Sequence, residues 1–290
     1  MKKIISLGFI CLLGLGFLTG CASDTAEESA SLSVAVSIVP QRTFVEAVAG
    51  DLVDVVVMIP PGYSPENYAP TPQQIQDFSR ASLYFTIGVP TEAANILPKA
   101  QRLNESVEII PLQGEVDEIY PLHREGEADG PADPHIWLSP KRVKIMIGAI
   151  ERELSKLDPD HGDIYHQNAE DYTAQLDQLD ADIRAALEGL ENKTIIVYHP
   201  AFGYFAEDYG LTMIALEQEG KAATARDFQD ALDTAKEEGI KVIFYQEEFD
   251  SRQAETFAAE IGGEAIEVAP LAPDYIDNLR KTADAFARVK

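Results

Sequence analysis

Two histidines stand where this 290-residue sequence could bind a metal ion. His199 directly follows residues 194–198, whose β-branched side chains predict a buried strand. His135 lies in Asp-Pro-His-Ile-Trp-Leu-Ser-Pro (133–140), where the prolines and the only Trp of the chain predict a rigid loop. Neutral imidazole is a common ligand of divalent transition metals. Taken alone, each histidine also fits a structural role, in the core at 199 or in a helix-capping loop at 135.

A carboxylate occupies a similar place after another predicted strand. Glu66 is the only charged residue of the proline-rich segment 60–72, which begins where the predicted strand 53–59 ends. Ligands of open α/β sheets bind beyond the carboxyl ends of the strands. Glu66 is therefore a candidate ligand, although a surface carboxylate is the simpler interpretation of this residue alone. The remaining histidines lie in a charged loop or on the first turns of a predicted helix, which is typical of exposed side chains (His123, His161 and His166).

The N-terminal residues predict export and a lipid anchor. Lys2 and Lys3 precede the apolar run 4–18, which resembles the positive and apolar regions of a secretory signal and is too short to span a bilayer. The run ends in Leu-Thr-Gly-Cys, similar to a bacterial lipobox. We therefore expect a signal peptide at 1–20, acylation of Cys21 and a flexible, polar tether at 21–31. A plain secretory signal that happens to end near a Cys is the alternative.

Composition excludes several other functions. The two cysteines, Cys11 and Cys21, fall in the signal and at the acylation site, so the folded part has no thiol for a disulfide, a metal site or a nucleophile. The formal net charge of −26 at pH 7 repels phosphates, which makes a nucleic-acid partner unexpected. An acidic surface of this kind otherwise indicates little more than solubility.

Strands alternate with helices along the rest of the chain. This order predicts an α/β fold with parallel sheets. The expected strands are residues 33–39, 53–59, 83–87, 107–110, 194–198, 212–216, 241–245 and 265–268.

Helix-start signals divide the sequence further. Thr71-Pro72, Ser139-Pro140 and Thr224 each predict the N-cap of a helix. A longer helix opens at Asp158-Pro159, and its apolar residues recur at alternating spacings of four and three to Leu190. At ~1.5 Å per residue, such a helix would run about 45 Å. We therefore expect two α/β lobes, 32–157 and 191–290, joined by one long rigid helix at 158–190 that limits hinge motion.

Taken together, the three candidate segments resemble a known family. Asp-Pro-His-Ile-Trp-Leu-Ser-Pro, Tyr-His-Pro-Ala-Phe-Gly-Tyr-Phe (198–205) and Pro-Gly-x-x-Pro-x-x-Tyr-x-Pro-Thr-Pro (61–72) are similar to motifs of the zinc/manganese solute-binding lipoproteins of ABC importers, the ZnuA/TroA-like group. The resemblance covers nearly the whole mature chain. It implies that His135 and His199 bind a metal ion outside the cytoplasm, and that the permease of an ABC importer is the partner at the membrane.

The sequence departs from this family at two ligand positions. Glu66 stands where the family usually has His, and a carboxylate there would give a site of two histidines and one glutamate. Ala269 stands where the family often supplies an Asp. Gln246, which ends the predicted strand 241–245, is our candidate for completing the shell, with Glu247 or water as alternatives.

These ligands favour Zn²⁺, with Mn²⁺ or Fe²⁺ as alternatives. A histidine ligand must be neutral, so we expect binding to weaken as the pH falls through about 6. In the mechanism we expect, Glu66 and His135 of one lobe and His199 of the other capture the ion, and the permease separates the lobes to release it.

Three other functions compete with this hypothesis. Changes at the ligand positions could leave a binding lipoprotein of the same fold with an altered or lost metal site. A zinc-dependent hydrolase would use a similar shell with an open position, but the sequence has no His-Glu-x-x-His helix, so we do not expect an enzyme. A tethered lipoprotein could also serve as a surface adhesin.

Overall fold

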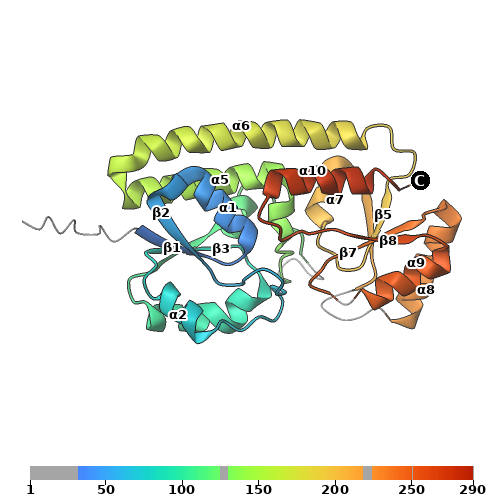
Figure 1. Cartoon of the computed structure of the whole chain (residues 1–290), viewed down its shortest axis with the longest axis horizontal. Coiled ribbons are helices and arrows are strands. Elements are labelled where there is room, and N and C mark those ends of the chain that lie inside the picture. The colour runs from blue at the N-terminus through green and yellow to red at the C-terminus, as the bar shows by residue number, and fades with distance from the viewer. Residues whose placement is uncertain (1–31, 125–129, 218–223, 250, 290) are drawn as a thin grey trace, which may run out of the picture. The chain divides into compact units, whose positions relative to one another are not determined.

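Two parallel sheets organise the chain (Figure 1). The structure is a computed structural model, and it describes residues 32–124, 130–217, 224–249 and 251–289. The predicted signal peptide, Cys21 and the whole of the predicted tether lie outside the described residues. Within the described part, the helices are all too short or too polar to cross a bilayer.

The N-terminal sheet has the strand order β2-β1-β3-β4, with every neighbouring pair parallel. Its strands are β1 (Leu32–Val36), β2 (Val53–Val57), β3 (Leu83–Thr86) and β4 (Glu108–Pro111). The helical segments around it are α1 (Val39–Ala49), η1 (Gly50–Leu52), α2 (Pro72–Phe78), η2 (Glu92–Ile96), α3 (Leu97–Leu103), α4 (Leu112–Asp117), η3 (His135–Leu138) and α5 (Pro140–Leu157).

The C-terminal sheet repeats this arrangement, with the strand order β6-β5-β7-β8 and all pairs parallel. Its strands are β5 (Thr194–Val197), β6 (Thr212–Ala215), β7 (Val242–Tyr245) and β8 (Glu264–Glu267). The helices of this half are α7 (Gly203–Tyr209), α8 (Ala225–Glu238), α9 (Arg252–Ile261) and α10 (Tyr275–Phe286). In each sheet the strand order runs outward in opposite directions from the two central strands, which are β1 and β3 in the first sheet and β5 and β7 in the second. Open α/β sheets bind ligands at the point where the strand order reverses in this way.

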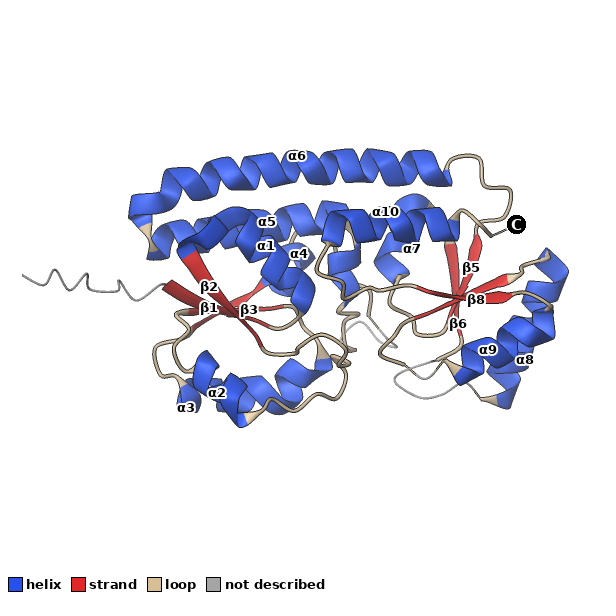
Figure 2. Cartoon of the chain, viewed as in Figure 1, coloured by secondary structure: helices blue, strands red, loops and turns tan. Residues whose placement is uncertain are grey.

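One helix runs along both halves. Helix α6 (Gly162–Leu187) follows a short turn of 3-10 helix, η4 (Pro159–His161), and packs against α1, α5 and α10 (Figure 2). The predicted fold class, two α/β lobes joined by a long helix, is therefore confirmed. The structure differs from the prediction at the end of α6, which stops at Leu187, and Leu187 rather than Leu190 is the buried apolar residue there. A spacing of four and three drifts around a straight helix of 3.6 residues per turn, and the chain leaves the helix before Gly189, whose φ is 79°.

The strand and cap predictions agree with the structure to within a few residues. The largest difference is at 33–39, where the strand ends at Val36 because helix α1 already begins at Val39. Thr71 and Gln74 form the predicted capping box, and the hydroxyls of Ser139 and Thr224 accept the expected hydrogen bonds from backbone N–H groups.

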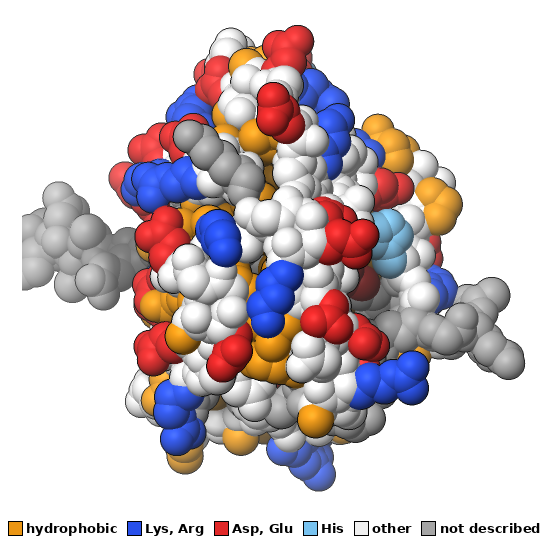
Figure 3. Space-filling view, turned by 90° about the vertical axis from the view of Figure 1, so that its right-hand side faces the viewer, with side chains coloured by type: hydrophobic (Ala, Val, Ile, Leu, Met, Phe, Trp, Pro, Cys, Tyr) orange, Lys and Arg blue, Asp and Glu red, His pale blue; other side chains and the backbone are white. Residues whose placement is uncertain are grey.

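On the face shown in Figure 3, Lys and Arg side chains are scattered among Asp and Glu.

A buried carboxylate closes the carboxyl edge of the N-terminal sheet. Glu92 is 1% exposed. Its oxygens accept hydrogen bonds from the hydroxyl of Ser37 and from the backbone N–H groups of Ile87 and Gly88, the latter two at 2.8 Å. Burial raises the pKa of Glu92 to about 7, although these hydrogen bonds act in the opposite direction. The folded protein therefore holds a proton on this group at a pH where the unfolded chain does not.

We expect Glu92 to lower the stability of the fold as the pH rises. Because its pKa is higher in the folded than in the unfolded chain, its stabilising contribution is complete below about pH 4.5 and is lost as the pH rises to about 7. The difference corresponds to about 3 kcal/mol of unfolding free energy. Urea unfolding of the metal-free protein at pH 5 and at pH 8 gives two unfolding free energies. The difference between them should be about 3 kcal/mol smaller in Glu92→Gln than in the unchanged protein. An unchanged pH dependence in the variant would contradict the assignment.

Candidate metal site

His135 is the first residue of the short helical turn η3, and Asp133 holds its ring at Nδ1. The carboxylate of Asp133 accepts the backbone N–H of His135 at 3.0 Å and lies 2.7 Å from its Nδ1. The ring also packs at 5.1 Å from that of Trp137, whose Nε1 donates to the carbonyl of Pro270 at 2.9 Å. Through this bond the loop of the N-terminal half is joined to a loop of the C-terminal half.

His199 sits just beyond the carboxyl end of β5, as its sequence position predicts. Its Nδ1 lies 2.6 Å from a carboxylate oxygen of Glu217, which follows the neighbouring strand β6. The ring of Phe249 stacks on the imidazole at 4.5 Å between ring centroids. Both Glu217 and His199 are buried.

The two imidazoles face each other through their remaining nitrogens. Nε2 of His135 lies 3.2 Å from Nε2 of His199. A carboxylate is only an acceptor, so Asp133 and Glu217 each hold the proton on Nδ1 and leave the Nε2 lone pair free. Two lone pairs at this separation repel unless a proton or a cation lies between them. Two nitrogens on one tetrahedral Zn²⁺ would be roughly 3.3 Å apart, given Zn–N bonds of ~2.0–2.1 Å.

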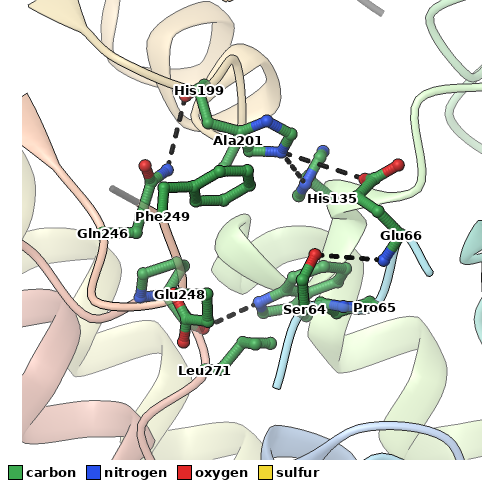
Figure 4. Close-up of a pocket in the computed structure, with 12 residues that line it drawn as sticks. Ser64, Pro65, Glu66, His135, His199, Ala201, Gln246, Glu248, Phe249 and Leu271 are labelled. Atoms are coloured by element: carbon green, nitrogen blue, oxygen red, sulfur yellow. Dashed lines mark hydrogen bonds and ion pairs between the residues drawn. The ribbon is translucent and has the colours of Figure 1, made fainter. Parts of the chain in front are cut away.

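Glu66 completes a three-residue cluster. Its Oε1 lies 4.0 Å from Nε2 of His199. One ligand atom from each of Glu66, His135 and His199 lies within 4.8 Å of the others, and this is the group among the described residues that could hold a metal ion. Figure 4 shows the three side chains converging from different segments of the chain. The three residues predicted separately from the sequence are therefore brought together.

Gln246 lines the same pocket, but its ligand role stays a prediction. Its Nε2 donates to the backbone carbonyl of His199 at 3.3 Å, as Figure 4 shows. Its Oε1 is buried and has no hydrogen-bond partner among the described residues. Glu248 also lines the pocket, and burial raises the pKa of its carboxyl.

The other histidines lie outside the cluster. His161 pairs with Asp158 at 2.7 Å, and the side chain of His166 is 66% exposed. His123 stacks on Tyr204 at 4.3 Å. The first two match the exposed positions expected from the sequence, whereas His123 has a defined partner that its charged loop did not predict.

Sequence reasoning missed the two carboxylates that orient the imidazoles. Asp133 was visible only as part of a motif, although an acidic residue two positions before a ligand histidine can reach its ring. The position of Glu217 gave a usable signal, because it follows the predicted strand 212–216 and the carboxyl ends of parallel strands share one edge of a sheet. Burial raises the pKa of Asp133, but the hydrogen bonds from the ring and the backbone N–H of His135 act in the opposite direction, and that pKa lies below its usual value.

The fold and this cluster define a two-lobed metal-binding protein, and comparison with known proteins identifies the family. Residues 34–289 match the family described as ZnuA, zinc-uptake complex component A, periplasmic. The chain belongs to this family. It is therefore an extracytoplasmic, metal-binding solute-binding protein of ABC import, a transport component and not an enzyme.

Individual relatives differ in the metal that their names specify. The chain is 30% identical over 297 residues to the high-affinity zinc uptake system protein ZnuA of Bacillus subtilis, covering 93% of this chain and 92% of that protein. It is 28% identical to the manganese ABC transporter substrate-binding lipoprotein PsaA of Streptococcus mitis, covering 90% and 87%. A crystal structure of ZnuA has 36% identity and a TM-score of 0.83, covering 89% of this chain and 99% of that chain.

The buried Glu217 gives a direct test of how the site is oriented. We expect Glu217→Ala to weaken Zn²⁺ binding roughly 10- to 100-fold, because loss of an outer carboxylate frees the ligand imidazole to rotate. Glu217→Gln keeps an acceptor for Nδ1 and should lose less. The exposed Glu264→Ala is the matched control and should bind like the unchanged protein. Equal affinities for all three variants, from a chelator-competition titration, would exclude this role.

Proposed function

We propose that this chain is a lipid-anchored carrier that captures Zn²⁺ with Glu66, His135 and His199 and delivers it to the permease of an ABC importer. The observation that carries the proposal is the pair of facing Nε2 atoms, 3.2 Å apart, each oriented by a carboxylate behind it. An arrangement that exposes two unprotonated nitrogens to each other is suited to a cation between them.

The ligand set favours zinc over manganese. Two imidazoles and a single carboxylate are borderline donors that suit Zn²⁺, whereas Mn²⁺ prefers sites richer in oxygen. The segment at 269–271 offers no carboxylate, and the apolar Pro270 and Leu271 line the pocket together with Phe249. The buried Oε1 of Gln246 or a water molecule would complete a four-ligand shell. Imidazole also suits Fe²⁺, but a site of nitrogen and oxygen donors binds Fe²⁺ less tightly than Zn²⁺ in the Irving–Williams order.

The ligands come from both predicted lobes, 32–157 and 191–290. Glu66 and His135 belong to the first and His199 to the second, so a bound ion would hold the two together. The linking segment, predicted at 158–190, packs along both and would keep their separation small. Release would then require the permease to pull the lobes apart.

Substitution of the ligands tests the proposed function. His135→Ala and His199→Ala should each weaken Zn²⁺ binding by more than the roughly 10- to 100-fold expected when a carboxylate that orients a ligand imidazole is removed. Glu66→Gln keeps an oxygen ligand without the charge and should lose less. Titration of metal-stripped protein should be followed by calorimetry and by the fluorescence of Trp137, the only Trp, which packs against His135.

The control for these variants is His166→Ala, which removes an exposed imidazole and should leave binding unchanged. Mn²⁺ should displace Zn²⁺ poorly. The absence of any Zn²⁺ binding by the unchanged protein would favour a lipoprotein with a lost metal site. Mn²⁺ binding tighter than Zn²⁺ binding would overturn the metal assignment but not the site.

The anchor is a separate part of the proposal and rests on the sequence around Cys21. When the full chain is expressed in a bacterial host, labelled palmitate should enter the unchanged protein and the Cys11→Ser control. Cys21→Ser should be unlabelled and should leave the membrane fraction. Labelling of the Cys21→Ser protein, or equal membrane retention of all three, would contradict lipidation at this residue.

A further inference from the structure

We propose that helix α7 assembles His135 and His199 into one preformed half-site, and that Tyr204 is the positioning residue that links them. This inference rests on the proposed metal-binding function. The histidine pair is held together by α7, whereas Glu66 is held by a separate loop of its own lobe.

Tyr204 connects the C-terminal half to the loop of His135. Its buried hydroxyl donates to the backbone carbonyl of Asp133 at 2.8 Å and accepts the backbone N–H of His123 at 3.1 Å. Asp133 in turn holds both the backbone and the ring of His135. The hydroxyl of one residue on α7 is thus two hydrogen bonds away from the imidazole on the opposite lobe.

The far end of the same loop is also bound to α7. The hydroxyl of Ser139 donates to Asp208 at 2.6 Å, and the guanidinium of Arg142 donates to the same carboxylate at 3.0 Å and to Glu207 at 2.7 Å. That guanidinium lies over the ring of Tyr204 at 4.4 Å. Asp208 and Arg142 are almost fully buried, with side-chain exposures of 1% and 2%, so little water competes for these bonds.

Helix α7 is equally close to His199 in the chain. The helix begins at Gly203, and a tight turn leads into it, in which the N–H of Ala201 donates to the carbonyl of His199 at 2.8 Å. The loop of His135 and the turn of His199 are therefore fastened to the same short helix. This shared support explains how nitrogens from two lobes are held 3.2 Å apart.

Glu66 has a different support. Its loop is bound to its own lobe, where Thr91 donates its N–H to the carbonyl of Pro65 at 3.1 Å and accepts the N–H of Tyr68 on its hydroxyl at 3.0 Å. Among the described residues, the Glu66 carboxylate accepts no hydrogen bond, and its side chain is 28% exposed. The pair of histidines is thus fixed, while the carboxylate is the ligand left free to adjust.

The test compares two conservative changes on one helix. Tyr204→Phe removes the hydroxyl that holds Asp133, whereas Tyr209→Phe removes a hydroxyl of α7 that donates to Asp180 on α6 at 3.0 Å. We expect Tyr204→Phe to weaken Zn²⁺ binding about 10-fold and Tyr209→Phe to leave it within about twofold. The visible absorption bands of the Co²⁺-loaded protein report ligand geometry and should change only in Tyr204→Phe.

Thermal unfolding of the metal-free variants separates positioning from a general loss of stability. Wild-type Zn²⁺ affinity and an unchanged Co²⁺ spectrum in folded Tyr204→Phe would overturn the inference while leaving the proposed function intact. Equal losses in both variants would also overturn it, because they would indicate a general effect on α7. If the unchanged protein binds neither metal, the proposed function itself fails.

Discussion

The pairing of each candidate ligand imidazole with a carboxylate at its Nδ1 is the constraint on which the proposed site depends. Asp133 and Glu217 hold the protons on Nδ1 of His135 and His199, and so direct two lone pairs at one point. Such an arrangement is unfavourable without a cation, because like dipoles then face each other in a buried pocket. The fold supplies the packing and hydrogen bonds that keep the imidazoles in place, and a bound ion would turn that cost into affinity.

Three parts of the fold hold these side chains in place: the ends of the parallel strands, the loop of His135 and helix α6. Parallel strands place Glu66, His199 and Glu217 beyond the carboxyl ends of β2, β5 and β6. The loop of His135 lies between the two sheets and is joined to the C-terminal half through Trp137 and the residues of α7. Helix α6 packs along both halves, so any opening of the site has to work against a continuous helix.

Much of this arrangement could be predicted from the sequence, and the limits have physical causes. Short β-branched runs, proline at helix starts and motif spacing located all eight strands of the described chain and the three clustered candidate ligands. The spacing pattern overran the end of α6, because a repeat of four and three ignores the local turn at Gly189. The contacts of Glu217 and Tyr204 were missed because they are tertiary, whereas Asp133 lies only two residues from His135. Glu217 is 18 residues from His199, and Tyr204 reaches a loop 71 residues away.

The central claim is that two imidazoles and one carboxylate bind the same zinc ion. X-ray absorption at the zinc edge of the stoichiometric complex measures this directly, because imidazole rings give characteristic scattering beyond the first shell. We expect two histidine nitrogens with oxygen ligands in a four-coordinate shell, and the loss of one imidazole in either His135→Ala or His199→Ala. A zinc ion coordinated by oxygen alone, or an unchanged spectrum in both variants, would contradict the account.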